Sequence, residues 1–167
     1  IKGRGKLANR LANQRIVMIG LGSLGASIAE LLTRAGVTQL TCIDGNALEM
    51  GNLCRHTLCM TDLYQSKSKL VAKRLTNIDP NIHTTYAERY LDIDETGALV
   101  PDLSSFDIII DSTGEDQVLA LLSATEWKRK IVFCSSSVGL GAKLLYINIQ
   151  RTKLPHFENF LNLVEPY

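Results

Sequence analysis

Short apolar runs alternate along this chain with stretches in which apolar residues recur at helical spacing. The runs are rich in β-branched residues and are too short for helices, so they predict strands. We expect strands at residues 15–19, 37–44, 82–88, 106–111, 130–134 and 142–149. The helical spacing predicts helices at residues 23–35, 65–77 and 116–127. Strands that alternate with helices in this way predict an α/β fold with a doubly wound, mostly parallel, Rossmann-like sheet and helices on both faces.

The segments between these elements are less regular. The basic residues 2–15 carry Leu7 and Leu11 four positions apart, which suits a short amphipathic helix, either a solvated basic face or an arm that contacts a ligand. Residues 46–62 are irregular and polar. We expect a short helix near 94–99 and a loop of small residues at 135–141.

Composition and charge narrow the class of protein. The chain has 167 residues, of which 46% are hydrophobic, enough for one α/β domain with a real core. The net charge of +1 gives no electrostatic reason to expect a nucleic acid or membrane partner. The four cysteines contain no C-x-x-C pair, so a zinc ribbon is not supported. Cys42 and Cys134 lie in apolar runs and are expected to be buried thiols in a reducing, cytoplasmic setting.

The ends of the chain suggest a fragment of a longer protein. It starts at Ile1 and stops at Tyr167 without a closing element. We therefore expect a nucleotide-binding domain over residues 1–150 and the start of a truncated continuation over 151–167.

A glycine motif follows the first predicted strand directly. Gly20, Gly22 and Gly25 form the pattern G-x-G-x-x-G, with Leu21 and Ser23 between them, and a helical stretch comes next. A strand, a glycine turn and a helix together form the phosphate-binding βα turn of a nucleotide-binding sheet, where the free amides and dipole of the helix attract an anion. A purely structural tight turn is the alternative.

Three polar side chains then become candidates for the same site. Asp44 ends the second predicted strand, about 20 residues after the glycines, where an acid binds ribose hydroxyls. Turn chemistry alone would also explain an aspartate at that position. Arg55 and Lys67 follow in the next loop and at the next helix, where an arginine and a lysine can neutralise phosphates. They could equally be surface charges, as could Lys69 and Lys73.

The ordered set of motifs is more specific than the glycines alone. It comprises the glycine turn, Cys42-Ile43-Asp44, Gly51-Asn52-Leu53-Cys54-Arg55-His56, Gln65-Ser66-Lys67 and Asn77-Ile78-Asp79-Pro80. Over roughly residues 10–150 this set resembles the ThiF/MoeB/HesA family of adenylation domains, relatives of ubiquitin-activating enzymes. The resemblance implies that Asp44 binds the ribose of ATP and that Asn52, Arg55 and Lys67 contact its phosphates.

The sequence departs from the family pattern at three positions. His56 replaces a usual glutamine, and Asn46 stands where an acid is common. The acid credited with holding Mg²⁺ falls on Gly114. Asp111, Glu115 or Asp116 could take over, and we expect Asp116 to be the metal ligand and Asp111 to assist in cofactor binding. Cys54 and Cys59 do not lie where the family places an acceptor cysteine.

The resemblance implies an ATP- and Mg²⁺-dependent enzyme that adenylylates the C-terminal carboxylate of a ubiquitin-like protein or peptide. Arg55, Lys67 and Asp116 would be its catalytic residues, and a homodimer is expected. An NAD(P)-dependent oxidoreductase would explain the glycines and Asp44 but leave the cations without a role. A degenerate, non-catalytic scaffold is the other alternative, because of Gly114.

Overall fold

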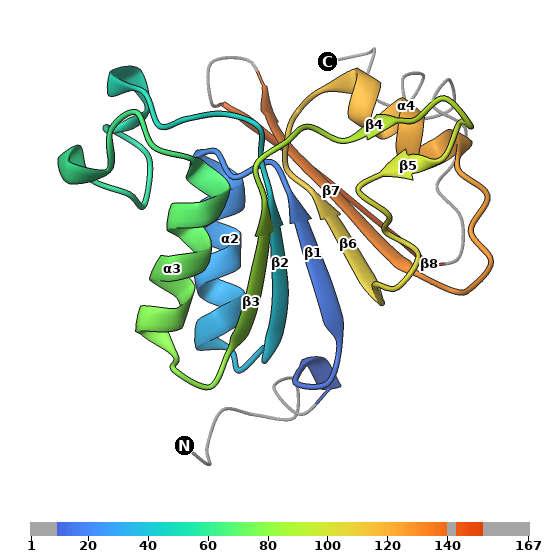
Figure 1. Cartoon of the computed structure of the whole chain (residues 1–167), viewed down its shortest axis with the longest axis horizontal. Coiled ribbons are helices and arrows are strands. Elements are labelled where there is room, and N and C mark those ends of the chain that lie inside the picture. The colour runs from blue at the N-terminus through green and yellow to red at the C-terminus, as the bar shows by residue number, and fades with distance from the viewer. Residues whose placement is uncertain (1–9, 140–142, 152–167) are drawn as a thin grey trace.

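A computed structural model describes residues 10–139 and 143–151, and a six-stranded sheet forms its centre (Figure 1). The strands lie in the order β3-β2-β1-β6-β7-β8, of which the first five are parallel and β8 is antiparallel to β7. The strands are β1 (Arg15–Ile19), β2 (Gln39–Ile43), β3 (His83–Ala87), β6 (Ile108–Asp111), β7 (Val132–Gly139) and β8 (Leu144–Arg151). The helices are α2 (Ser23–Arg34), α3 (Lys67–Ile78) and α4 (Asp116–Ala124). The predicted doubly wound, mostly parallel sheet is confirmed.

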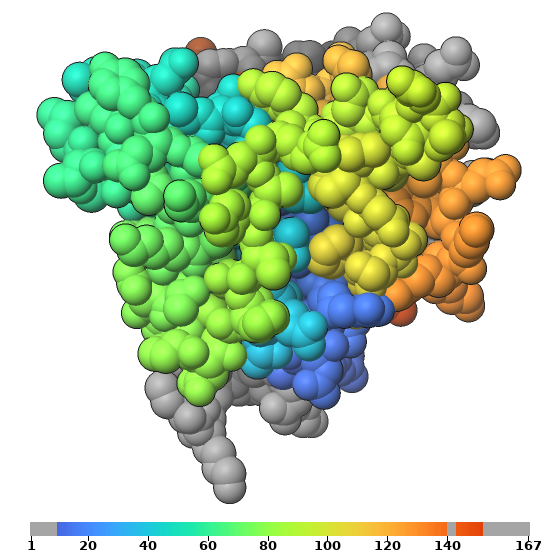
Figure 2. All heavy atoms as spheres, viewed as in Figure 1, coloured from blue at the N-terminus to red at the C-terminus, as the bar shows by residue number. Residues whose placement is uncertain are grey.

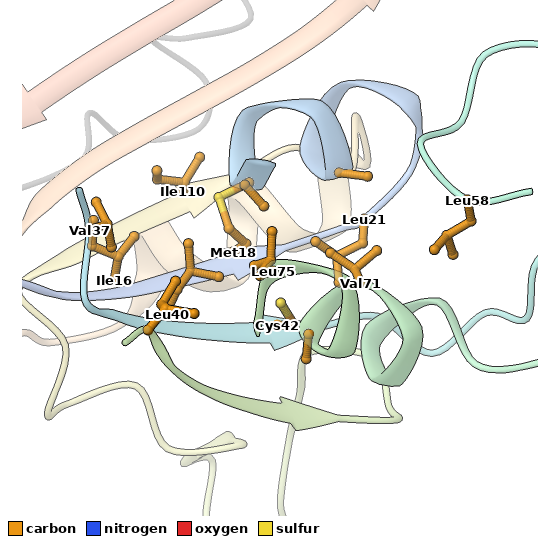
Figure 3. Close-up of a cluster of buried hydrophobic side chains, with 14 of the residues drawn as sticks. Ile16, Met18, Leu21, Val37, Leu40, Cys42, Leu58, Val71, Leu75 and Ile110 are labelled. Carbon is orange, nitrogen blue, oxygen red and sulfur yellow. The ribbon is translucent and has the colours of Figure 1, made fainter. Parts of the chain in front are cut away.

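Helices cover both faces of the sheet because β1 is apolar on both sides. Alternate residues of β1 enter two separate cores: Met18 packs with α2 and α3, and Val17 packs with α4. Figure 3 shows the first of these cores, with Leu40 of β2 and Leu75 of α3 beside Met18. Cys42 belongs to it as predicted, and its burial raises the pKa of its thiol to about 12. Cys134 is only partly buried.

The strand order reverses next to β1, which pairs with β2 on one side and β6 on the other. The helix after β1 covers one face and the helix after β6 covers the other (Figure 1). A crevice therefore opens at the carboxyl ends of these strands, where ligands bind in open α/β sheets.

At the opposite, amino-terminal end of β1 and β6, Asp107 joins two arginines. Its carboxylate accepts hydrogen bonds from the backbone N–H of Arg15 at 2.8 Å, from the Arg15 side chain and from Arg129. Partial burial by itself favours the protonated acid, but these donors hold the pKa of Asp107 below its ordinary value of 3.8.

Two predictions in the connecting segments are wrong. Residues 94–99 do not form a helix but the turn of a small hairpin between β4 (Asp92–Ile93) and β5 (Leu99–Val100). The side chain of Asp94 accepts hydrogen bonds from the N–H groups of Thr96 and Ala98, and Gly97 has a left-handed φ of 80°. These hydrogen bonds from the backbone to the Asp94 side chain favour a turn over a helix.

The green-to-yellow segment from β3 to β6 forms much of the face seen in Figure 2.

The predicted small-residue loop at 135–141 is also wrong for its described part. Residues 135–139 continue β7, and their backbone pairs with β8 up to Gly139 opposite Leu144. Small polar residues suited a loop by composition, but Ser136 is buried in the sheet and donates to the backbone oxygen of Asp111.

Other predicted segments shift only at their ends or lie outside the described residues. Residues 46–62 hold two short 3₁₀ turns, η1 (Met50–Asn52) and η2 (Met60–Asp62). Of the predicted N-terminal helix, residues 10 and 11 are helical, and 2–9 lie outside the described residues. Residues 152–167 lie outside them too. Among the residues described, no helix is both long enough and apolar enough to span a membrane.

Candidate functional site

A cavity of about 530 Å³ opens at the carboxyl ends of β1, β2 and β6. Its walls come from the glycine turn after β1, the loop after β2, the first residue of α3, the segment after β3 and the start of α4. Predicted residues that line it are Gly20, Gly22, Asp44 and Lys67. The fold therefore brings together residues that lie far apart in the sequence, from Gly20 to Lys67.

The glycines of the turn are required by space and by backbone conformation. Gly20 has a left-handed φ of 80°, and a Cβ there would lie 2.8 Å from the backbone nitrogen of Thr113. At Gly25 a Cβ would lie 2.0 Å from the carbonyl oxygen of Gly20, so only glycine lets α2 approach β1 this closely. Gly22 has open space around it and lines the cavity. It precedes α2 and supplies no side-chain cap, which leaves the first amides of the helix open to an anion.

The residues between the glycines play other parts. Leu21 is fully buried and packs into the core, so the turn contributes its backbone rather than this side chain. Ser23 begins α2 and is not among the residues that line the cavity.

Asp44 connects the second strand to this turn. It is 9% exposed, and its Oδ2 accepts a hydrogen bond from the N–H of Leu21 at 2.7 Å. Its Oδ1 accepts from the N–H of Asn46 at 2.7 Å. A carboxylate has about four acceptor positions, so two remain for donors within the cavity. Hydroxyl groups of a sugar would be suitable donors.

Lys67 differs sharply from the other lysines of α3. Lys67 is only 8% exposed and lines the cavity, whereas Lys69 and Lys73 are exposed on the helix surface. Its backbone N–H donates to the carbonyl oxygen of Asn46 at 3.1 Å, which holds the helix start against the loop after β2. Within residues 10–139 and 143–151, its ammonium group has no hydrogen bond or ion pair. An ammonium group without a protein partner on the wall of a cavity is suited to contact an anion bound there.

Asn52 and Arg55 are not among the residues that line the cavity. The side chain of Asn52 accepts a hydrogen bond from the N–H of Glu49 at 3.1 Å and so stabilises the short turn η1. Arg55 lies exposed in the following loop, and its guanidinium has no side-chain partner in the described part of the chain. Their roles toward phosphate stay predictions.

The acidic candidates after β6 occupy three different environments. Asp111 is buried and accepts from Thr113, through both its N–H and its hydroxyl, and from Ser135. Its burial raises the pKa of this carboxyl above its ordinary value, which the hydrogen bonds partly oppose. Glu115 lines the cavity, whereas Asp116 is exposed in the first turn of α4 and does not.

No cluster of three or more metal-ligating side chains occurs among the residues the structure describes. Mg²⁺ commonly uses one or two carboxylates together with substrate phosphates, so the acids at the start of α4 suit that mode of binding. The ligand assigned to Asp116 stays a prediction.

Several residues that line the cavity were not among the predicted site residues, and Arg89 and Tyr90 are the polar ones in the segment directly after β3. Both follow β3, and the hydroxyl of Tyr90 donates to the side-chain oxygen of Asn46 at 2.5 Å. The ring of Tyr90 also lies against Gly45, where a Cβ would come within 2.9 Å of it. The position of Arg89 and Tyr90 in the sequence could have indicated this role, because they come directly after a parallel strand, at the edge of the sheet where ligands bind.

Comparison with known proteins gives one family. The model of the ThiF family matches residues 4–161. The chain is 34% identical over 146 residues to the ATP-dependent ubiquitin transferase-like protein Cap2 of Enterobacter hormaechei, an alignment that covers 87% of this chain and 24% of the relative. It is 32% identical over 129 residues to the molybdopterin-synthase adenylyltransferase of Escherichia coli, covering 76% of this chain and 50% of that protein.

The fold is also that of a solved structure, E. coli MccB, with a TM-score of 0.66 at 18% identity over 79% of this chain and 37% of the MccB chain. This chain thus spans at most half the length of the relatives named here. The family match extends over the sheet, the glycine turn and every residue of the cavity. The chain therefore belongs to the ThiF family.

Proposed function

We propose that this protein uses ATP to adenylylate the C-terminal carboxylate of a ubiquitin-like protein or peptide. The observation that carries the proposal is Lys67, a buried residue that lines a glycine-rimmed cavity and whose ammonium group has no described partner. A triphosphate supplies the negative charge that this cation lacks, and the open amides at the start of α2 add donors for the same group.

The chemistry of the cavity walls supports one proposed orientation for ATP. The triphosphate lies over Gly22 and beside Lys67, and the ribose hydroxyls donate to the free acceptor positions of Asp44. Arg89 and Tyr90 then border the nucleoside. Asn52 and Arg55 are assigned to the phosphates by the resemblance of their motif to the family.

The proposed chemistry is an attack by the carboxylate of the substrate on the α-phosphate of ATP. A C–O–P linkage forms and the bond between the α- and β-phosphates breaks, so the products are an acyl adenylate and pyrophosphate. The protein contributes alignment and positive charge, from Lys67 and Arg55, because transfer of the adenylyl group needs little covalent help from the protein. Asp116 is the proposed Mg²⁺ ligand, with Glu115 next to it in the chain and Asp111 at the end of β6.

The names of two relatives support this substrate class. One is an ATP-dependent ubiquitin transferase-like protein and the other is an adenylyltransferase for molybdopterin synthase. Since the chain spans at most half of those proteins, we propose that residues 1–150 are the adenylation domain and that 151–167 begin a continuation. We place the protein in the cytoplasm.

We further propose that the protein is a homodimer. On β8, at the edge of the sheet, Leu145, Ile147 and Ile149 are 57%, 59% and 66% exposed, and Val138 of β7 lies opposite Leu145. A second copy could bury this apolar row. Ile147→Lys is expected to yield a monomer in analytical ultracentrifugation, whereas a protein that is monomeric before the change would exclude the dimer.

The direct test is ATP–pyrophosphate exchange by the protein with a ubiquitin-like substrate. Labelled pyrophosphate is expected to enter ATP when the substrate has a free C-terminal carboxylate. The same substrate with a C-terminal amide is the matched control and is expected to support none. Exchange with neither substrate, together with ATP binding, would favour the scaffold alternative that Gly114 keeps open. No relative named here supports the oxidoreductase alternative.

A further inference from the structure

His56 links the glycine turn to the loop that carries Arg55. Its Nε2 lies 2.7 Å from the carbonyl oxygen of Leu21, the residue between Gly20 and Gly22. The N–H of the same leucine donates to Asp44. Both backbone polar groups of Leu21 are therefore held by side chains from outside the turn.

The other ring nitrogen of His56 completes a bridge. Its Nδ1 accepts a hydrogen bond from the N–H of Leu58 at 3.1 Å. A carbonyl oxygen can only accept and a backbone N–H can only donate, so the imidazole is neutral with its proton on Nε2. Leu21 and Leu58 are both buried in the hydrophobic cluster drawn in Figure 3, which fixes the two ends of the bridge.

We propose that His56 is a positioning residue for ATP: its neutral imidazole locks the phosphate-binding turn to the loop of Arg55, so that ATP binds best when this ring is uncharged. The inference rests on the proposed function. It goes beyond the family pattern, in which a glutamine is usual at this position.

Protonation would break the bridge at one end. An imidazolium carries a hydrogen on Nδ1, which would then face the N–H of Leu58, a donor against a donor. Leu58 is 6% exposed, and its amide would lose its acceptor where water has little access. The loop would have to move away from the glycine turn, and Arg55, next to His56 in the chain, would move with it.

The charges around His56 come from three elements. Lys67 at the start of α3 disfavours the imidazolium, whereas Asp44 after β2 and Asp62 in η2 favour it. Burial is the largest influence and lowers the pKa of His56 below its ordinary value of 6.5, and Lys67 acts in the same direction. The hydrogen bond to Leu21 and the two acids oppose this shift. The ring is therefore neutral at pH 7.

The size of the effect follows from the fraction of neutral imidazole. If only that form binds ATP well, the apparent dissociation constant rises in proportion to one over this fraction. With a pKa below 6.5, the loss of affinity between about pH 7.5 and about pH 5.5 is at most about tenfold. A simple electrostatic role would give the opposite sign, because an imidazolium near phosphates would strengthen binding at low pH.

The test is calorimetric titration of the protein with ATP and Mg²⁺ across this pH range, for the wild type, His56→Gln and His83→Gln. Glutamine keeps a donor and an acceptor but does not titrate. His83 is exposed at the start of β3, at the far end of that strand from the cavity, and serves as the matched control. The titration of ATP itself is common to all three proteins and cancels in the comparison.

We expect the wild type and His83→Gln to lose affinity in parallel at low pH, and His56→Gln to lose less affinity than they do, by a factor of at most about ten. A His56→Gln profile that superimposes on the wild type across the pH at which NMR shows His56 of the wild type to titrate would overturn the inference and leave the proposed function intact. If no variant binds ATP at any pH, the proposed function fails and the inference with it.

A second readout does not depend on a folded variant. In the wild type, binding that prefers the neutral ring must in turn lower the pKa of His56, which NMR of the imidazole protons measures. A pKa lowered by saturating ATP and Mg²⁺ is expected. A pKa raised by ATP would contradict the bridge.

Discussion

Replacing Lys67 with methionine separates its role in binding from its role in the fold. Methionine keeps an unbranched, buried side chain and removes the charge. Lys67 is 8% exposed and its ammonium has no described partner, so its removal should not weaken the folded protein. An unbranched apolar side chain of similar length keeps the packing of the stem and leaves no charge to desolvate, so the free energy of unfolding should not fall. ATP binding, by contrast, loses a charge-assisted contact to phosphate.

The expected loss follows from that contact. A hydrogen bond to a charged group contributes about 1.5–3 kcal/mol, which corresponds to a rise in dissociation constant of roughly 10- to 150-fold. Lys69→Met is the matched control, because Lys69 lies on the same helix but is exposed. Calorimetric titration gives the affinity and urea denaturation gives the free energy of unfolding.

The two variants should separate clearly. Lys67→Met is expected to lose affinity without losing stability, and Lys69→Met is expected to change neither by much. Equal ATP affinity in Lys67→Met and the wild type would refute the reasoning. A parallel loss of binding and stability would also refute it, since the lysine would then support the fold rather than the ligand.

Other expectations concern the turn, the far end of the sheet and the metal. Gly25→Ala should cost more than about 3 kcal/mol in urea denaturation because its Cβ meets backbone, whereas Gly22→Ala should fold like the wild type and bind ATP more weakly. Folding lowers the pKa of Asp107, so its carboxylate stabilises the protein at pH values above its ordinary pKa of 3.8, and this contribution is lost as the pH falls through the folded pKa. Asp107→Asn should therefore have a lower free energy of unfolding at neutral pH, and this free energy should fall less steeply in acid, as measured by the same assay. Asp116→Asn should raise the Mg²⁺ concentration needed for half-maximal pyrophosphate exchange. If this concentration rises in Glu115→Gln and not in Asp116→Asn, the metal ligand is Glu115 rather than Asp116.

The features that could be predicted from the sequence are those whose residues lie close together in the chain. The glycine turn could be predicted because its spacing, the strand before it and the helix after it are all local. Asp44 followed from its distance to that turn. Lys67 could not be separated from Lys69 by charge or spacing alone, and only the resemblance favoured it. The structure adds a physical distinction, since burial sets Lys67 apart from its neighbours.

The wrong predictions and the missed cavity residues depend on contacts between distant segments or on side-chain hydrogen bonds. Ser136 belongs to a run of small polar residues that is typical of a loop, but its strand pairs with β8 and the residue is buried. Asp94 lies in a stretch that could be helical, but its side chain bonds the backbone of its own turn. Tyr90 enters the site through contacts with Asn46, which is 44 positions away in the chain. No local pattern contains that information. Arg55 was predicted beside the cavity but is not among its lining residues, so its role still rests on the family motif.

The most direct test of the central claim is a crystal structure of the protein with Mg²⁺ and a non-hydrolysable ATP analogue. We predict that the triphosphate lies over Gly22 with an oxygen in contact with the ammonium of Lys67, and that the ribose hydroxyls donate to Asp44. An analogue bound away from this cavity, or bound with its phosphates turned away from Lys67, would contradict the account.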